Sequence, residues 1–255
     1  MSEMSSFSRA LPISGASNFR DLGHYLNAEG RRVRTGSLFR SDNLAGLDAQ
    51  DQERIRQLGI TRSFDFRGVQ EREASRYELP GVQQHHLPIE PTVVQGIQSI
   101  LEAGRSMTAG DTVDLMQQTY RDFVYHNSDR FADLFGHILR EDQPLVFHCT
   151  AGKDRTGLAA ALILLALDVP MDTVMQDYLL TNQLYRMPDA NEERRVPQEV
   201  LNVLWRVQAD FLHAAFQVID AEYGSVDAYL TERLGLRPDA REHLQHTYLV
   251  GEAKR

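Results

Sequence analysis

The sequence predicts an α/β fold in which helices flank a central, mostly parallel sheet. Two observations predict it: segments with a strand pattern are separated by segments with helical periodicity, and the last part of the chain is helical alone. The 255 residues contain no repeat, low-complexity tract or obvious linker. We therefore expect a single domain covering residues 1–255.

Four segments have the pattern of strands: 32–40 (RVRTGSLFR), 60–66 (ITRSFDF), 81–89 (GVQQHHLPI) and 144–147 (PLVF). The first alternates between apolar and polar residues, and the last is a short apolar run typical of a buried strand. In open α/β sheets, ligands bind at the carboxyl ends of the strands. His148 and Cys149 follow the last strand directly, so we expect the functional site there.

Helical periodicity accounts for most of the remaining chain. Helices are predicted over 48–58, over most of 90–126, from a cap at Asn127 or Ser128, and along LAAALILLAL. A long helix is predicted to follow residues 194–197 and to end near Tyr223-Gly224, with two shorter helices after it. We expect the helices between Glu90 and Asn127, with the segment Met171–Pro197, to form a lid over the site. The alternative is that they only extend the helical layer.

Charge and hydropathy exclude several classes of protein. The formal net charge of −9 argues against a general nucleic-acid binder, because binding to the phosphate backbone needs a basic face. No apolar run is long enough to form an integral membrane segment, and the N-terminus lacks the pattern of a signal peptide, so we expect a cytoplasmic protein. The charged stretch Asn191–Arg195 is expected to be a solvated helix start.

The single cysteine, Cys149, lies in the segment HCTAGKDRTG between a predicted strand and a predicted helix. One cysteine allows no internal disulfide, which fits a reducing compartment. The seven residues CTAGKDR have the length to curl around a tetrahedral oxyanion, with backbone N–H groups and the positive end of the next helix directed at it. The predicted phosphate-binding residues are Thr150, Ala151, Gly152, Lys153, Asp154 and Arg155.

The same loop supplies the parts of a nucleophilic site. Converging N–H dipoles and the charges of Lys153 and Arg155 favour a Cys149 thiolate, which is a strong nucleophile. The hydroxyl of Thr156 can donate to that sulfur. The planar guanidinium of Arg155 can hold two phosphate oxygens at once, which lysine cannot do. The alternative is that Cys149 is an inert, buried structural residue.

A departing alkoxide or phenoxide also needs a proton. Asp154, inside the loop, is the first candidate for the general acid. Its structural alternative is to cap the following helix or to orient Arg155. Asp65, at the end of the second strand, and Glu90, just after the third, are further candidates.

HCTAGKDRTG resembles the phosphate loop of the protein tyrosine phosphatase superfamily, HCxxxxxR[ST], in the AGKDR form of atypical bacterial and fungal members. Further segments that resemble the family are SNFRDLG (17–23), GSLFRSD (36–42), FDFR (64–67), DYLLTN (177–182) and the stretch 223–235. The resemblance implies the tyrosine phosphatase fold, Cys149 as nucleophile and Arg155 as phosphate-binding arginine. A clear WPD-type acid loop is absent, since HHLPIEPTV occupies about that place.

The resemblance also implies substrates. The first expectation is a phosphatase for phosphotyrosine, with reach to phosphoserine and phosphothreonine. A lysine at the position of Lys153 occurs in similar lipid phosphatases, so phosphoinositides are the second expectation. A catalytically silent phosphate-binding module is the third.

No metal or cofactor is expected: His85 and His86 would face opposite sides of a strand, and no cluster has metal-ligand spacing.

Overall fold

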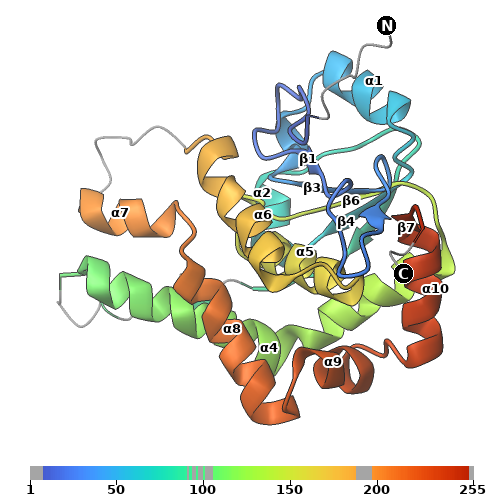
Figure 1. The fold of residues 1–255 in the computed structure, drawn as a ribbon. Helices are drawn as coiled ribbons and strands as arrows, with labels where there is room; N and C mark the ends of the chain where they lie inside the picture. Colours follow the sequence, from blue (N-terminus) through green and yellow to red (C-terminus); the bar gives the residue numbers. More distant parts are fainter. Residues whose placement is uncertain are drawn as a thin grey trace, which may run out of the picture.

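The computed structural model describes residues 8–90, 92, 93, 96, 100, 106–187 and 197–252. At its centre is a five-stranded sheet with the spatial order β1 (Arg20–Asp21), β3 (Leu38–Ser41), β6 (Leu145–His148), β4 (Arg62–Asp65) and β5 (Gln83–His86) (Figure 1). The last four run parallel, and only β1 is antiparallel to its neighbour. The predicted mostly parallel sheet is confirmed.

The register of the parallel strands brings three chain segments to one edge. Ser41 and Asp65 both lie opposite His148, so all three central strands end at the same level. The residues that follow, Asp42, Phe66 and Cys149, therefore leave the sheet side by side at its carboxyl edge. This is the edge at which an α/β fold binds ligands.

Alternating side chains of β6 divide the core into two layers. Val146 packs with Phe39 and with Ile55 of α1 (Ala49–Gln57) on one face of the sheet. Leu145 and Phe147 point to the other face, into a larger core. That face is covered by α4 (Ala109–Arg140), α5 (Arg155–Ala166), α6 (Met171–Leu184) and α8 (Ala209–Tyr223) (Figure 1).

Helix α5 forms the middle of this layer. Its apolar sequence has no polar face, and eleven of its residues are buried. Because α5 begins at Arg155, its N-terminus is fixed immediately behind the loop that leaves β6.

The single strand predicted over 32–40 is wrong in one respect. The chain forms β2 (Arg32–Val33) and then β3, separated by a turn in which Gly36 has φ +71°. Strand β2 pairs with β7 (Leu249–Val250) in a separate two-stranded sheet. Both β1 and β7 were missed, because two residues carry no readable periodicity.

Two helix boundaries also differ from the prediction. Neither Asn127 nor Ser128 caps a helix, since α4 continues unbroken to Arg140. The Ser128 hydroxyl instead donates to the Val124 carbonyl within the helix and bonds the Tyr229 hydroxyl.

The long helix expected to end at Gly224 is two helices, α7 (Gln198–Leu204) and α8. The break has a visible cause. The Asn182 side chain bonds both the N–H and the carbonyl of Val207, which removes these groups from helical bonding. Gly224, with φ +79°, ends α8 as predicted.

The remaining elements of the described chain are shorter. They are a 3₁₀ turn at Leu44–Gly46, α2 (Val69–Ala74), α9 (Val226–Ala228) with a π-helical turn at Tyr229–Arg233, and α10 (Pro238–Tyr248). The charged stretch Asn191–Arg195 and much of the expected lid fall outside the described residues. Within the described part of the chain, no helix is both long and apolar enough to cross a membrane.

Candidate active site

The loop from Cys149 to Arg155 curls at the carboxyl edge of the sheet, between β6 and α5. Gly152 makes this curvature possible. Its φ is +62°, and a Cβ there would lie 2.3 Å from the backbone oxygen of Ser41. The loop therefore packs against β3 more closely than any other residue would allow.

The outer side of the loop is held by donors from the N-terminal segments. Asn18 Nδ2 donates to the carbonyls of Ala151 (3.1 Å) and Gly152 (3.0 Å). Arg40 Nη2 also donates to Gly152 (2.8 Å), and the Asn43 N–H donates to Thr150 (3.0 Å). The N–H groups of residues 150–154, in contrast, donate to no acceptor in the described part of the chain. Carbonyls held outward and amides left open make a cradle for an anion.

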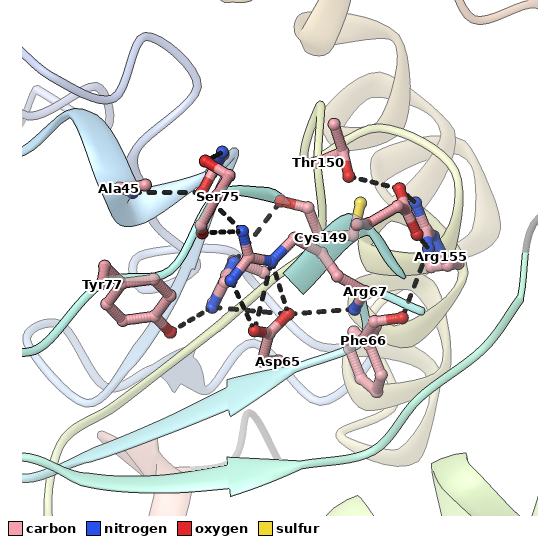
Figure 2. Close-up of polar contacts among 12 residues, drawn as sticks. Ala45, Asp65, Phe66, Arg67, Ser75, Tyr77, Cys149, Thr150 and Arg155 are labelled. Carbon is pink, nitrogen blue, oxygen red and sulfur yellow. Dashed lines mark hydrogen bonds and ion pairs between the residues drawn. The ribbon is translucent and has the colours of Figure 1, made fainter. Parts of the chain in front are cut away.

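Cys149 lies in this cradle with only 2% of its surface exposed. Figure 2 shows its sulfur next to Arg155 and Thr150. Arg40 and Arg155 both interact electrostatically with the cysteine. The neighbouring Thr156 is fully buried, and its hydroxyl has no hydrogen-bond partner among the described residues, which leaves it available to a thiolate.

Part of the Arg155 guanidinium is hydrogen-bonded within the protein, and one edge of it has no partner among the described residues. Glu71 of α2 accepts from Nη1 (2.6 Å) and Nη2 (2.9 Å), and the carbonyls of Phe66 and Ile89 also accept from Nη1. Among the described residues, the Nε–H and the second Nη2–H have no partner. These two are adjacent and parallel, the geometry that bidentate binding of phosphate requires.

Glu71 is a site residue that the sequence analysis missed. Besides Arg155, it accepts from the Thr150 hydroxyl and from the Gly68 N–H. Burial alone would raise its pKa, but the hydrogen bonds and charge of Arg155 outweigh burial and lower it, so Glu71 is a carboxylate at neutral pH. The available signal was its place, a few residues after FDFR at the end of a strand.

Asp154 has neither of the structural roles considered for it. It stands at the N-cap position of α5 but makes no side-chain cap hydrogen bond, and it makes no hydrogen bond to Arg155. Its carboxylate instead bonds Lys153 Nζ through both oxygens (2.9 and 2.8 Å) and accepts from the Tyr120 hydroxyl (2.9 Å). Its side chain is 21% exposed, whereas that of Lys153 is 3% exposed.

The other two acid candidates have partners elsewhere. Asp65 is buried and pairs with Arg67 through both of its oxygens, as Figure 2 shows. Glu90 accepts from the Val69 N–H (2.9 Å). In the described part of the chain, neither carboxylate bonds a residue of the 149–155 loop. Of the three candidates, only Asp154 lies in the loop.

His148 supports the loop from below. Its Nε2 lies 2.6 Å from the Tyr77 hydroxyl and its Nδ1 lies 3.4 Å from the Cys149 carbonyl oxygen. Burial lowers its pKa to about 4, so the ring is neutral at neutral pH.

Two buried arginines join the sheet to α6. Arg20 and Arg40 both pair with Asp177 (3.2 and 2.7 Å). Burial alone would raise the Asp177 pKa, but the two arginines lower it to about 2. Arg20 is therefore part of a buried ion pair that joins β1 to α6.

Aromatic residues stand at the side of the loop. Tyr185 follows α6, and its pKa is raised by burial and by the nearby charges of Asp42 and Cys149. Its ring lies against Trp205 at the end of α7, with centroids 6.4 Å apart. Lys153 Nζ also donates to the carbonyl of Arg206 (3.5 Å), which directly follows Trp205, so the loop contacts the segment that carries this aromatic pair.

The described residues offer no ready site for a resident metal. In the described part of the chain, no group of three or more His, Cys, Asp or Glu side chains gathers in a way that could hold an ion. The ring of His85 is occupied in packing, 4.9 Å from Phe64 and 4.2 Å from His137.

Comparison with known proteins gives consistent matches. The model of the tyrosine phosphatase family matches residues 11–250. A protein of Cupriavidus necator named as a tyrosine-protein phosphatase is 38% identical over 232 residues, covering 88% of this chain and 84% of the relative. The triple specificity protein phosphatase PtpB of Mycobacterium tuberculosis is 29% identical over 262 residues, covering 88% and 93%.

Solved structures show more distant likeness. TpbA of P. aeruginosa matches with a TM-score of 0.34 and 13% identity, over 75% of this chain and 96% of that one. The Siw14 catalytic core matches with a TM-score of 0.37 and 10% identity, over 83% and 95%.

Proposed function

The chain belongs to the tyrosine phosphatase family and is a protein-tyrosine phosphatase, and from this premise we propose that it works through a phosphocysteine intermediate on Cys149. The observation that carries the proposal is the loop itself. A buried cysteine lies under amides that donate to no acceptor among the described residues, beside an arginine whose Nε–H and second Nη2–H have no partner there.

In the first step, the Cys149 thiolate attacks phosphorus in line with the leaving oxygen. The S–P bond forms while the P–O bond to the substrate breaks. Arg155 and the loop amides bind the equatorial oxygens, where charge accumulates in the transition state. Asp154 gives its proton to the leaving oxygen and becomes a carboxylate.

In the second step, water attacks the phosphocysteine. The Asp154 carboxylate accepts a proton from this water, the S–P bond breaks, and inorganic phosphate leaves while Cys149 returns as the thiolate. Thr156 assists by donating its free hydroxyl to the departing sulfur. No step requires a metal.

Aromatic residues beside the loop support an aromatic phosphate ester as the substrate class. Phosphotyrosine is the first substrate, and the Tyr185–Trp205 pair supports this, because aromatic faces beside the loop can pack on the substrate ring. The triple specificity named for the mycobacterial relative supports a wider reach. Phosphoserine, phosphothreonine and phosphoinositides are the further substrates.

Lys153 is the residue that bears on phosphoinositides. Its ammonium pairs with Asp154 in this structure and lies inside the loop, where a second phosphate of a polyphosphorylated headgroup could draw it away. A lipid preference predicts that Lys153→Ala loses activity on a soluble phosphoinositide more than on a phosphotyrosine peptide.

The test is phosphate release from a phosphotyrosine peptide, a phosphoserine peptide and a soluble phosphoinositide, with EDTA and reductant present. Wild type should release phosphate, and Cys149→Ser should release none while still binding inorganic phosphate. Turnover that survives in Cys149→Ser would exclude the phosphocysteine route. If wild type is inactive on all three substrates but binds phosphate, the loop is a phosphate-binding module.

A further inference from the structure

Two buried tyrosines lead from the helical layer to Asp154. Tyr120 of α4 donates its hydroxyl proton to Asp154 Oδ1 (2.9 Å), and the Tyr178 hydroxyl of α6 lies 2.7 Å from that of Tyr120. Since the proton of Tyr120 is directed at the carboxylate, the proton of Tyr178 is directed at Tyr120. The hydrogen bonds therefore run in one direction, from Tyr178 through Tyr120 to Asp154.

The packing around the pair fixes both rings. Tyr120 is fully buried, and its ring contacts Phe123, Phe211 and Tyr178. Tyr178 lies against the first turn of α5, where a Cβ on Gly157 would come within 3.0 Å of its ring. Burial also raises the pKa of each tyrosine well above 10, so both keep their protons as donors at neutral pH.

Both hydroxyls are buried and both are hydrogen-bonded, so their burial costs little free energy. The distinguishing feature of the pair is the group at which its donors end. The chain of donors ends on a carboxylate that caps nothing, is partly exposed and belongs to the phosphate loop.

We propose that Tyr120, held by Tyr178, is the positioning residue of the general acid Asp154. The inference rests on the proposed function, since it requires that Asp154 protonate the leaving oxygen. When Asp154 gives up its proton, Tyr120 already points a donor at the carboxylate that forms. The polarising bond from Tyr178 strengthens that donor.

The contribution should depend on the leaving group. A good leaving group departs with little protonation, so weakening the general acid Asp154 lowers the rate only slightly. A poor leaving group must be protonated as it departs, so the same change lowers the rate more. The appropriate quantity is kcat/KM, which reports the steps up to formation of the phosphocysteine.

The experiment measures kcat/KM on aryl phosphates that range from para-nitrophenyl phosphate to phenyl phosphate. We expect Tyr120→Phe to lower kcat/KM about 10-fold on phenyl phosphate and less than about 2-fold on para-nitrophenyl phosphate. For Asp154→Asn, the difference between the losses on these two substrates should be larger. Tyr178→Phe should give a smaller effect of the same kind.

Tyr229→Phe is the matched control. It removes another buried tyrosine hydroxyl bonded to α4, at Ser128, away from the loop, and should follow wild type on every substrate. Near-UV circular dichroism and inorganic phosphate binding check that each variant is folded. If Tyr120→Phe does not fold, Tyr178→Phe, which keeps the Tyr120 hydroxyl, carries the test.

The double variant Tyr120→Phe/Asp154→Asn separates positioning from packing. If Tyr120 acts through Asp154, adding Tyr120→Phe to Asp154→Asn changes kcat/KM by less than about 2-fold. Equal losses on all substrates, or full additivity, would overturn the inference. If the loss in kcat/KM caused by Asp154→Asn does not depend on the leaving group, Asp154 is not the general acid and the inference fails with it. If that loss depends strongly on the leaving group for Asp154→Asn but not for Tyr120→Phe, the acid role stands and only the inference about Tyr120 fails.

Discussion

At the scale of single residues, the division of donors on Arg155 explains how one side chain can be both fixed and available. Glu71 and two carbonyls take the donors on one side, and the Nε–Nη2 edge remains open toward the loop. Burial alone would lower the Arg155 pKa, but the hydrogen bonds that Arg155 donates to the Glu71 carboxylate, with nearby negative charge, outweigh burial and raise it. The guanidinium is therefore charged and oriented before substrate arrives, which reduces the cost of reorganisation.

Arg155→Lys tests this arrangement. We expect kcat/KM to fall about 10²- to 10³-fold, because an ammonium cannot pair with Glu71 and offer a second parallel edge to phosphate. The measurement is steady-state kinetics on a phosphotyrosine peptide. Near-normal activity would contradict the bidentate role.

The matched control is Arg62→Lys, which alters another buried arginine. Arg62 donates to the carbonyls of His137, Glu141 and Gln143, away from the loop. We expect it to lower stability while leaving kcat/KM per folded molecule within about 2-fold of wild type. A similar loss in both variants would mean that the Arg155 effect is one of folding.

At the scale of elements, the phosphate loop depends on the close approach of two strand ends. Gly152 contacts the backbone of Ser41 and Asp42 after β3, and the same loop leads into α5. Strand β6 and helix α5 hold the two ends of the loop, and β3 lies against its middle.

Gly152→Ala should therefore destroy the loop rather than merely strain it. The new Cβ would lie 2.3 Å from the Ser41 oxygen at a φ of +62°, so the loop must move away from β3. We expect loss of inorganic phosphate binding and of turnover, measured by calorimetry and kinetics.

Gly224→Ala is the comparison, since that glycine also has a positive φ (+79°) but no atom lies within 4 Å of the added Cβ. It should cost only about 1 kcal/mol of unfolding free energy and leave turnover unchanged. If Gly152→Ala behaves in the same way, the close approach to β3 is not essential.

The elements also show where periodicity misleads. A polar pair, Asn127-Ser128, inside an apolar pattern reads as a helix start, yet α4 continues through it. Ser128 remains helical because its hydroxyl bonds the Val124 carbonyl one turn earlier and meets Tyr229, which comes from a distant segment. The reverse holds at Val207, where the Asn182 side chain breaks a helix that the local sequence allows.

At the scale of the whole molecule, the site is surrounded by buried charges and one buried neutral histidine. Burial lowers the pKa of His148 from its usual 6.5 to about 4. Between these values the unfolded chain binds a proton that the folded protein does not. The contribution of His148 to the free energy of unfolding is therefore constant above pH 6.5 and falls as the pH drops from 6.5 toward 4.

This predicts a loss of about 2 kcal/mol in unfolding free energy between pH 7 and pH 5 from His148 alone. Urea unfolding of wild type and of His148→Gln at both pH values measures this loss. The contribution of His148 is the change in unfolding free energy between the two pH values in wild type, minus the same change in the variant. His85, His86 and His137, whose pKa values burial also lowers, are common to both proteins and cancel.

His243→Gln, on the exposed face of α10, is the control and should keep the pH dependence of wild type. If His148→Gln keeps it too, His148 titrates in the folded protein as it does in the unfolded chain.

The sequence by itself determined the α/β class and the strand–loop–helix unit around Cys149, whose loop we propose to bind phosphate. These could be read because they depend on local pattern: seven consecutive residues between a buried strand and an apolar helix. The place of Gly152 and the stop at Gly224 follow from the same local rules.

Only the tertiary structure decided what surrounds that loop. Glu71 lies 84 residues from Arg155, Tyr120 lies 34 residues from Asp154, and Asp177 lies 137 residues from Arg40. Sheet register and helix packing bring these partners together, and neither leaves a periodic trace in the chain. The physical reason is that a loop's backbone shape is encoded locally, whereas the orientation of its charged side chains is set by groups that meet only when the layers pack.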